Sequence, residues 1–166
     1  HNFQGDRAGI VHRLDRATSG VMICAKHESA LKMLQKQFHD RQVKKNYIAV
    51  IKGELEPTKA NIIAPIGRNI HNPKQFHVTT LGKHAETVYE VVDSKNGYSL
   101  VRLTPATGRT HHLRVHLNHL AHPIVGDVLY GGEESTRLLL HAMSLEIKLP
   151  SGKLMNFTSV LPIEFK

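Results

Sequence analysis

The strongest constraint on the fold is a β-hairpin near the middle of the chain. Two runs with strand-like alternation, ETVYEVVD at 86–93 and YSLVRLT at 98–104, flank the segment SKNG. Its Asn96-Gly97 pair supplies the positive φ angles that a tight hairpin turn requires. The two runs should therefore pair as antiparallel strands, and the fold should contain an antiparallel sheet.

Further strands are predicted at 20–26, 46–52, 61–66, 138–149 and 154–160, the last two joined by the turn PSGK, with a polar loop at 68–77. Helical spacing of apolar residues predicts helices over 28–38 and 110–120. We expect Thr110 to cap the second helix and Pro123 to lie beyond its end. Hairpins without regular βαβ alternation indicate an α+β protein, with a largely antiparallel mixed sheet and peripheral helices.

The length and charge of the chain limit its class. Its 166 residues predict one domain, 1–166, which can bury a core without disulfides or a structural metal. With 22 Lys+Arg against 14 Asp+Glu the formal net charge is +8, and the isoelectric point is near 9.7. The chain is therefore expected to be a single basic domain.

The cysteine content and the absence of targeting signals predict a cytoplasmic setting. We find no membrane span and no secretory signal in the sequence. The single Cys24 lies in the apolar run GVMICA, so we expect it to be buried packing and not a nucleophile. Because the chain lacks an initiator Met and runs directly into a motif, we expect it to begin partway through a longer protein.

A carboxylate between two arginines is the first candidate functional motif. It lies in HRLDRATSG at 12–20, where Arg13 and Arg16 flank Asp15. Cations within about 4–6 Å favour an ionised carboxylate, so Asp15 is expected to be charged and fit to act as a nucleophile or base. The alternative is a loop salt bridge without a catalytic role.

Two further motifs carry aromatic and basic side chains. Tyr47, near the start of KKNYIAVIK, is either a core residue or a ring on which a nucleobase stacks, worth about 1–3 kcal/mol. In GRTHHLRVHL at 108–117 a turn leads into a helix, and Arg109 and Arg114 could converge on one carboxylate or phosphate, which makes Arg109 a candidate substrate-binding residue. The alternative is a solvated basic helix.

Histidines of the same helix raise the possibility of a metal site. His112, His116 and His119 share one helical face at i, i+4 and i+7. A zinc-protease helix carries Glu directly after the first His, and Leu113 stands at that position here. With 13 His in the chain such spacing arises readily, so a metal-dependent hydrolase is the weaker alternative and no metal ligand is predicted.

Taken together and in this order, HRLDRATSG, KKNY and GRTHHLRVHL resemble the RluA/RluD family of RNA pseudouridine synthases. APIGR at 64–68, HPIVGDVLYG at 122–131 and LLLHA at 138–142 are similar to further segments of that family. The resemblance implies the pseudouridine synthase catalytic fold and an isomerase that needs no cofactor. It also implies an RNA partner, with large-subunit ribosomal RNA expected first and transfer RNA second.

The same resemblance implies roles for individual residues. Asp15 would be the catalytic carboxylate, Arg114 its orienting salt-bridge partner, and Tyr47 the ring that packs on the target base. Arg13 would insert into the RNA stack as the uridine leaves it, and Leu113 would line the base pocket. We therefore expect the Arg114 guanidinium within salt-bridge reach of Asp15, with Tyr47 beside them.

Physical chemistry supports these roles independently of the resemblance. Breaking a glycosidic bond develops positive charge on the sugar, which one nearby carboxylate can stabilise or capture. Reaching a stacked base means flipping it out, at a few kcal/mol, and a net positive charge supplies salt-sensitive affinity for phosphates. Whether Asp15 attacks the sugar or removes a proton from it stays open.

The chain departs from the family pattern at two points. His112 stands where the family usually has Gln. Strands that normally precede the HRLD motif in the family, and a small RNA-binding domain that often does, are not seen in the sequence, so we expect the catalytic domain to be incomplete on its N-terminal side. A non-catalytic RNA-binding module of the same fold is therefore the main alternative to an enzyme.

Overall fold

The computed structural model describes residues 9–165, in which a seven-stranded sheet carries two α-helices on one side. The strands are β1 (Ser19–Gly20), β2 (Lys44–Lys52), β3 (Lys59–Ile63), β6 (Glu86–Lys95), β7 (Tyr98–Pro105), β8 (Leu140–Lys148) and β9 (Leu154–Thr158). Their order is β1-β8-β2-β7-β6-β3, and β9 also pairs with β8. All pairs are antiparallel except β1 with β8, which confirms the predicted α+β class.

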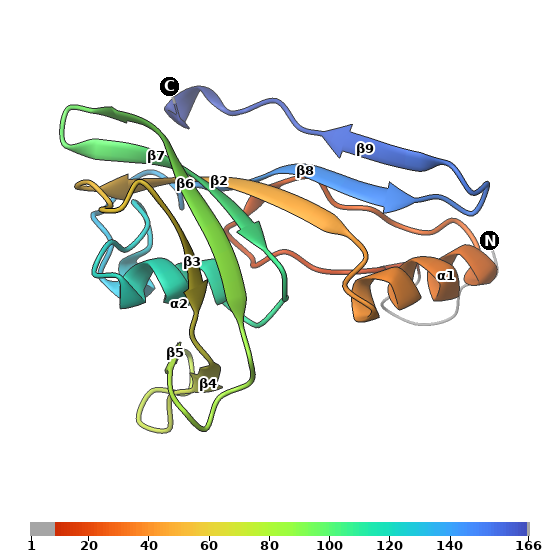
Figure 1. Ribbon diagram of the computed structural model, residues 1–166, viewed down its shortest axis with the longest axis horizontal. Helices are drawn as coiled ribbons and strands as arrows, with labels where there is room; N and C mark the ends of the chain where they lie inside the picture. Colours follow the sequence, from red (N-terminus) through yellow and green to blue (C-terminus); the bar gives the residue numbers. More distant parts are fainter. Residues whose placement is uncertain (1–8, 166) are drawn as a thin grey trace.

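Two helices and a small hairpin complete the fold (Figure 1). The helices α1 (Glu28–His39) and α2 (His112–His119) both lie below the large sheet in the view of Figure 1. The short strands β4 (Ile66–Arg68) and β5 (Phe76–Val78) pair with each other at the bottom of the same view, and β5 contacts α2. Two single-turn 3₁₀ helices, η1 (Val128–Tyr130) and η2 (Ile163–Phe165), lie in the C-terminal third of the chain.

The hairpin predicted around Asn96-Gly97 forms between β6 and β7. Lys95 pairs with Tyr98 across a turn in which Asn96 has φ 56° and Gly97 has φ 79°. The positive φ angles are those of the two-residue turn that twists with the strands. The second predicted hairpin also forms, because Lys148 pairs with Leu154 around the PSGK turn.

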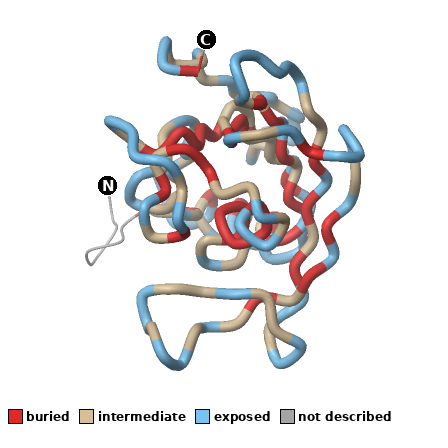
Figure 2. The backbone as a smooth tube through the Cα atoms, turned by 90° about the vertical axis from the view of Figure 1, so that its left-hand side faces the viewer, coloured by how far each residue is buried: buried red, intermediate tan, exposed pale blue. Residues whose placement is uncertain are grey.

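Helix α2 closes the main hydrophobic core against the central strands. Leu113 and Leu117 of α2 pack with buried residues of β2 and β7, among them Ile51 and Leu103. A second cluster joins Ala30 and Leu34 of α1 to Val43, Leu145 and Ile147. Figure 2 shows these buried stretches in red around the interior, with the β4–β5 segment standing off at the bottom.

The predicted buried strand over 20–26 is wrong. Only Ser19 and Gly20 form a strand, and Cys24, expected to be buried, is exposed and makes only an isolated bridge to Ile10. Val21 and Ile23 pack against the α1 cluster, whereas Met22 is 47% exposed. A short apolar run can be packed against the protein on one face or on both, and its composition is the same in the two cases. The sequence therefore does not show that one face of this segment is exposed.

Three other boundaries differ from expectation. The predicted strand at 61–66 divides into β3 and β4, because Pro65 lies between them and lacks the N–H that a continuous ladder needs. The loop predicted at 68–77 ends in β5. Helix α2 begins at His112, and its N-cap is His111 in a left-handed conformation with no side-chain cap bond, so Thr110 is not the cap.

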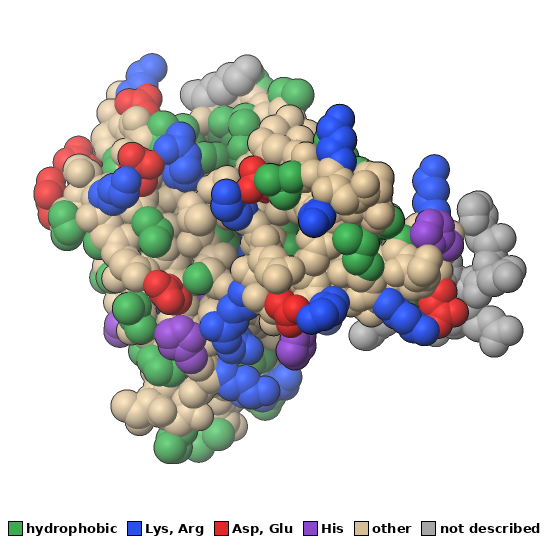
Figure 3. All heavy atoms as spheres, turned by 45° about the vertical axis from the view of Figure 1, so that its right-hand side comes forward, with side chains coloured by type: hydrophobic (Ala, Val, Ile, Leu, Met, Phe, Trp, Pro, Cys, Tyr) green, Lys and Arg blue, Asp and Glu red, His purple; other side chains and the backbone are tan. Residues whose placement is uncertain are grey.

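No helix within residues 9–165 is long and apolar enough to cross a membrane. Figure 3 shows that charge is spread over one face of the molecule, with several Lys and Arg side chains together in the lower middle of the view.

Candidate active site

The loop that carries Asp15 is fixed at the edge of the large sheet. The Thr18 N–H donates to the Asp15 carbonyl at 2.9 Å, which turns the chain back toward β1. Gly20 follows with φ 116°, and a Cβ at that position would lie 2.2 Å from the Ala142 carbonyl oxygen. Only glycine permits this close approach of β1 to β8, and the contact sets where the Asp15 loop ends.

Arg114 lies between two carboxylates. Its Nε and Nη2 each donate to Asp127 at 2.7 Å, one to each carboxylate oxygen, while Nη1 lies 3.8 Å from Asp15 Oδ2. The guanidinium carbon is 5.0 Å from the centre of the Tyr130 ring. The predicted proximity of Arg114 and Asp15 is thus confirmed, although the bidentate bond goes to Asp127.

The burial of this cluster determines its electrostatics. The Asp127 side chain is 1% exposed and that of Arg114 is 11% exposed, against 22% for Asp15. Burial opposes the charge on Arg114, but Asp127 and then Asp15 outweigh it and raise the pKa of Arg114. Because Asp127 already neutralises the guanidinium at hydrogen-bond distance, the three groups together keep one net negative charge, and Asp15 is the carboxylate that faces the pocket.

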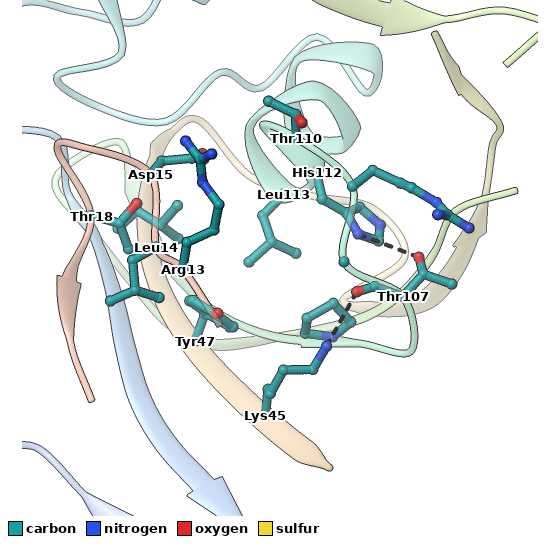
Figure 4. Close-up of a pocket in the computed structure, with 14 residues that line it drawn as sticks. Arg13, Leu14, Asp15, Thr18, Lys45, Tyr47, Thr107, Thr110, His112 and Leu113 are labelled. Carbon is teal, nitrogen blue, oxygen red and sulfur yellow. Dashed lines mark hydrogen bonds between the residues drawn. The ribbon is translucent and has the colours of Figure 1, made fainter. Parts of the chain in front are cut away.

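A pocket of about 150 Å³ opens beside Asp15 (Figure 4). Tyr47 on β2 and Leu113 on α2 line it, with the Asp15 loop on one side and the turn around Thr107 on the other. Burial and the nearby Asp15 raise the pKa of Tyr47 to about 12, so its phenol stays neutral at physiological pH. The site therefore offers a carboxylate, a flat neutral ring and an apolar wall within one small space.

The wall opposite Asp15 is held by a buried histidine network. His112 Nε2 lies 3.1 Å from Thr87 Oγ1, and the same hydroxyl lies 3.0 Å from His116 Nδ1. His112 Nδ1 lies 3.4 Å from Thr107 Oγ1, and His116 Nε2 lies 3.0 Å from the Ala64 carbonyl. Burial, with His116 and Lys45 nearby, lowers the pKa of His112 to about 3, so it is neutral.

These contacts overturn two sequence interpretations. The segment from His112 to Leu117 is buried throughout, so it is not a solvated basic helix. All four ring nitrogens of His112 and His116 face polar protein atoms within 3.4 Å, and no group of three metal-binding side chains is found in residues 9–165. The structure thus gives no support to a metal-dependent hydrolase.

The structure brings most of the predicted site residues together. Arg13, Asp15, Tyr47, Arg109 and Leu113 all line the pocket. The predicted convergence of Arg109 and Arg114 is wrong. Arg109 Nε donates to the His84 carbonyl at 2.9 Å, whereas Arg114 turns to its two carboxylates. A turn residue and a buried helix residue face different directions, which their spacing alone does not reveal.

Sequence reasoning missed Asp127 and Tyr130. Both lie in the HPIVGDVLYG segment, to which the sequence analysis assigned no role. The Tyr130 hydroxyl accepts a hydrogen bond from the Phe76 N–H at 2.9 Å and lies 2.8 Å from His111 Nδ1. One signal was available, since Asp127 is a lone acidic residue in an otherwise apolar and glycine-containing run.

Comparison with known proteins identifies the class of this fold and site. The family model described as RNA pseudouridylate synthase matches residues 1–119. The human protein RNA Pseudouridylate Synthase Domain Containing 1 superposes with a TM-score of 0.83 at 32% identity, covering 91% of this chain and 68% of the human one. The chain belongs to the RNA pseudouridine synthase family.

Particular relatives place it near the RluA and RluD types. It is 44% identical to Ribosomal large subunit pseudouridine synthase D of Borreliella burgdorferi, over 99% of this chain and 52% of that protein. It is 42% identical to Dual-specificity RNA pseudouridine synthase RluA of Escherichia coli, over 96% of this chain and 75% of that protein. The chain spans about half the length of most of the curated relatives it matches.

Proposed function

We propose that the protein isomerises uridine to pseudouridine in structured RNA, with Asp15 as the catalytic carboxylate. The observation that carries the proposal is the placement of Asp15, 3.8 Å from Arg114 and on the rim of a pocket lined by Tyr47 and Leu113. A reaction at a glycosidic carbon needs a carboxylate close to the sugar, and a base that is retained needs flat and apolar walls.

The reaction exchanges one bond to the ribose for another. The bond between uracil N1 and ribose C1′ breaks, the uracil turns within the pocket, and a bond forms between C5 and C1′. The proton on C5 then leaves to solvent and N1 takes up one proton, so uridine and product have the same atoms and no further reactant is needed. Asp15 assists at the sugar in one of two ways: it bonds to C1′ until C5 displaces it, or it takes a proton from C2′ and returns it as the C5–C1′ bond forms.

The other pocket residues would hold the base and replace it in the RNA. Tyr47, whose phenol is neutral at physiological pH, packs on the flipped uracil, and Leu113 bounds the ring from α2. The exposed Arg13 lies at the pocket and would occupy the space that the uridine leaves, which offsets part of the few kcal/mol cost of flipping.

We further propose large-subunit ribosomal RNA as the substrate class. The support is the name of the Borreliella relative, which specifies the ribosomal large subunit. Transfer RNA is the second candidate substrate, because the Escherichia coli relative is named as having dual specificity.

Tritium release from RNA labelled at uridine C5 tests the proposal. The label leaves only when C5 is joined to the ribose, so the full-length protein should release it from ribosomal RNA. Asp15→Asn should reduce release to the level without enzyme, whereas Asp93→Asn, which alters an exposed carboxylate on the β6 strand, should release tritium at the normal rate. Tight binding without release from ribosomal or transfer RNA would instead establish a non-catalytic RNA-binding module.

A further inference from the structure

A second pocket adjoins the base pocket and carries cations that the proposed reaction does not use. It has a volume of about 510 Å³ and lies between the C-terminal end of α1 and the turn at 106–109. Lys45 and Arg109 line both pockets, and Arg41 lines only the second. None of the described residues that line the second pocket is acidic. We call this space the anion pocket.

Lys45 is the inner cation of the anion pocket, and it lacks a carboxylate partner. Its Nζ donates to the Thr107 carbonyl at 3.3 Å, and no carboxylate within residues 9–165 lies within 4.0 Å of it. Burial lowers the pKa of Lys45, as expected for an ammonium withdrawn from water without a counter-charge. The neighbouring Lys44 points away, is exposed, and pairs with Glu146 at 2.9 Å.

Arg41 lies at the rim of the anion pocket, where it ends helix α1. Its φ is 58°, in the left-handed region where glycine and asparagine are the favoured residues. Its side chain is exposed and makes no ion pair with any residue in the described part of the chain. The nearby Asp40 is already engaged by Lys36 and His39. The Gln42 N–H donates to the Gln37 carbonyl at 2.9 Å and the Arg41 N–H to the Phe38 carbonyl at 3.3 Å, so this backbone conformation is the ordinary C-terminal cap of α1. The cap holds the exposed Arg41 side chain at the rim of the pocket, where its guanidinium can bind an anion.

One side of the anion pocket is formed by two stacked rings and a buried valine. Phe38 stacks on His12 with ring centroids 4.5 Å apart and an interplanar angle of 18°, and the buried Val43 lies beside them. Burial, together with Lys45, lowers the pKa of His12 to about 4, so this imidazole is neutral and accepts a hydrogen bond from the Ile23 N–H at 3.1 Å. The pocket thus combines a neutral wall with cations at one end and at the rim.

We propose that the anion pocket binds a backbone phosphate of the RNA next to the target uridine, between Lys45 at its inner end and Arg41 and Arg109 at its rim. This inference rests on the proposed function for the identity of the base pocket. Lysine and arginine bind phosphate oxygens by charge-assisted hydrogen bonds, and the apolar wall accommodates the adjoining sugar. Because Lys45 and Tyr47 belong to both pockets, the bound phosphate would fix which nucleotide reaches Asp15.

RNA binding by three variants tests the anion pocket. Each variant is made in the inactive Asp15→Asn full-length protein, so that the RNA is bound and not converted, and Kd is measured by fluorescence anisotropy over a range of salt. Lys45→Met and Arg41→Asn should each weaken binding about ten-fold or more and lower the slope of log Kd against log salt by about 0.7–0.9. Lys44→Met is the matched control and should leave both unchanged.

Arg41→Asn guards against misfolding as an explanation. Asparagine suits the left-handed conformation at position 41, so this variant should be at least as resistant to thermal unfolding as the parent while binding RNA more weakly. The proposal would be overturned if all three variants had the same Kd and the same salt slope as the Asp15→Asn parent. Because binding is scored without turnover, that result leaves the tritium-release test of the proposed function intact, and failure of tritium release leaves this test intact.

Neutral methylphosphonates, placed one at a time in the RNA backbone, distinguish the source of the phosphate. One position near the target uridine should weaken binding to the protein with Lys45, and should cause no further loss in the Lys45→Met variant. If no position behaves in this way and uridine monophosphate binds to the pocket instead, the site takes free phosphate monoesters and the proposal of an RNA subsite is wrong.

Discussion

Replacing Asp127 by alanine should destabilise the protein strongly. Asp127 is 1% exposed and makes two 2.7 Å hydrogen bonds to Arg114, whose side chain is 11% exposed. Removing one partner of a buried ion pair leaves the other charge uncompensated, at about 3–5 kcal/mol. Asp15 remains 3.8 Å from the guanidinium and relieves part of this cost, so we expect a loss of about 3 kcal/mol.

Thermal and urea unfolding followed by circular dichroism measure this loss. For a chain of this size, about 3 kcal/mol corresponds to a fall in Tm of roughly 6–12 °C. The double variant Arg114→Met/Asp127→Leu removes both charges and should recover most of the stability, because a buried pair is replaced by apolar groups. Arg137→Met is the control, since it breaks a more exposed pair with Glu164 at 3.8 Å and should cost less than about 1 kcal/mol.

A loss below about 1 kcal/mol in Asp127→Ala would refute this reasoning, because exposed ion pairs already contribute that much. A double variant no more stable than the single one would refute it as well, by showing that the cost comes from lost packing and not from an unpaired charge.

Two further predictions concern stability. The pKa of His112 is about 3 in the folded protein and 6.5 in the unfolded chain, so the unfolded chain binds a proton first as the pH falls. The free energy of unfolding therefore decreases between pH 6.5 and pH 3, and this group alone lowers it by about 2 kcal/mol at pH 5. His112→Gln should flatten the acid side of a plot of unfolding free energy against pH, and an unchanged curve would contradict the assignment. Gly126→Ala should lower the free energy of unfolding far more than Gly152→Ala. Both glycines have φ above 80°, but a Cβ at 126 would lie 1.9 Å from the Arg137 carbonyl oxygen, whereas one at 152 meets nothing within 4 Å. Equal urea midpoints for the two glycine variants would show that the contact is relieved by movement.

Elements set by local chemistry were predictable from sequence. The hairpin at Asn96-Gly97 and the helix over 28–38 depend on turn residues and spacing, and both form in the structure. The segment after Gly20 was mispredicted because its exposure depends on which neighbour covers it. Helix α2 begins late because His111 adopts a left-handed conformation, which its sequence does not signal.

The candidate site was only partly predictable, for a related reason. The motif residues Asp15 and Arg114 were found because each stands in a distinctive local pattern. Asp127 was not assigned a role because its function follows from a bidentate contact made across the fold. Lys45 was noted in the KKNY motif without a role of its own, because a lysine at the start of a strand is ordinary. The role proposed for it depends on its being buried with no counter-charge, which only the structure reveals.

One row of the large sheet joins distant parts of the chain. Gly20 pairs with Ala142, Ala142 pairs with Tyr47, and Tyr47 pairs with Leu103. During synthesis, Asp15 therefore leaves the ribosome well before the strand that anchors its loop, and at about 5–20 residues per second the delay is on the order of ten seconds. Throughout that interval the sheet row behind the Asp15 loop is incomplete. The pocket beside Asp15 therefore takes its observed form only once β8 pairs with β1 and β2.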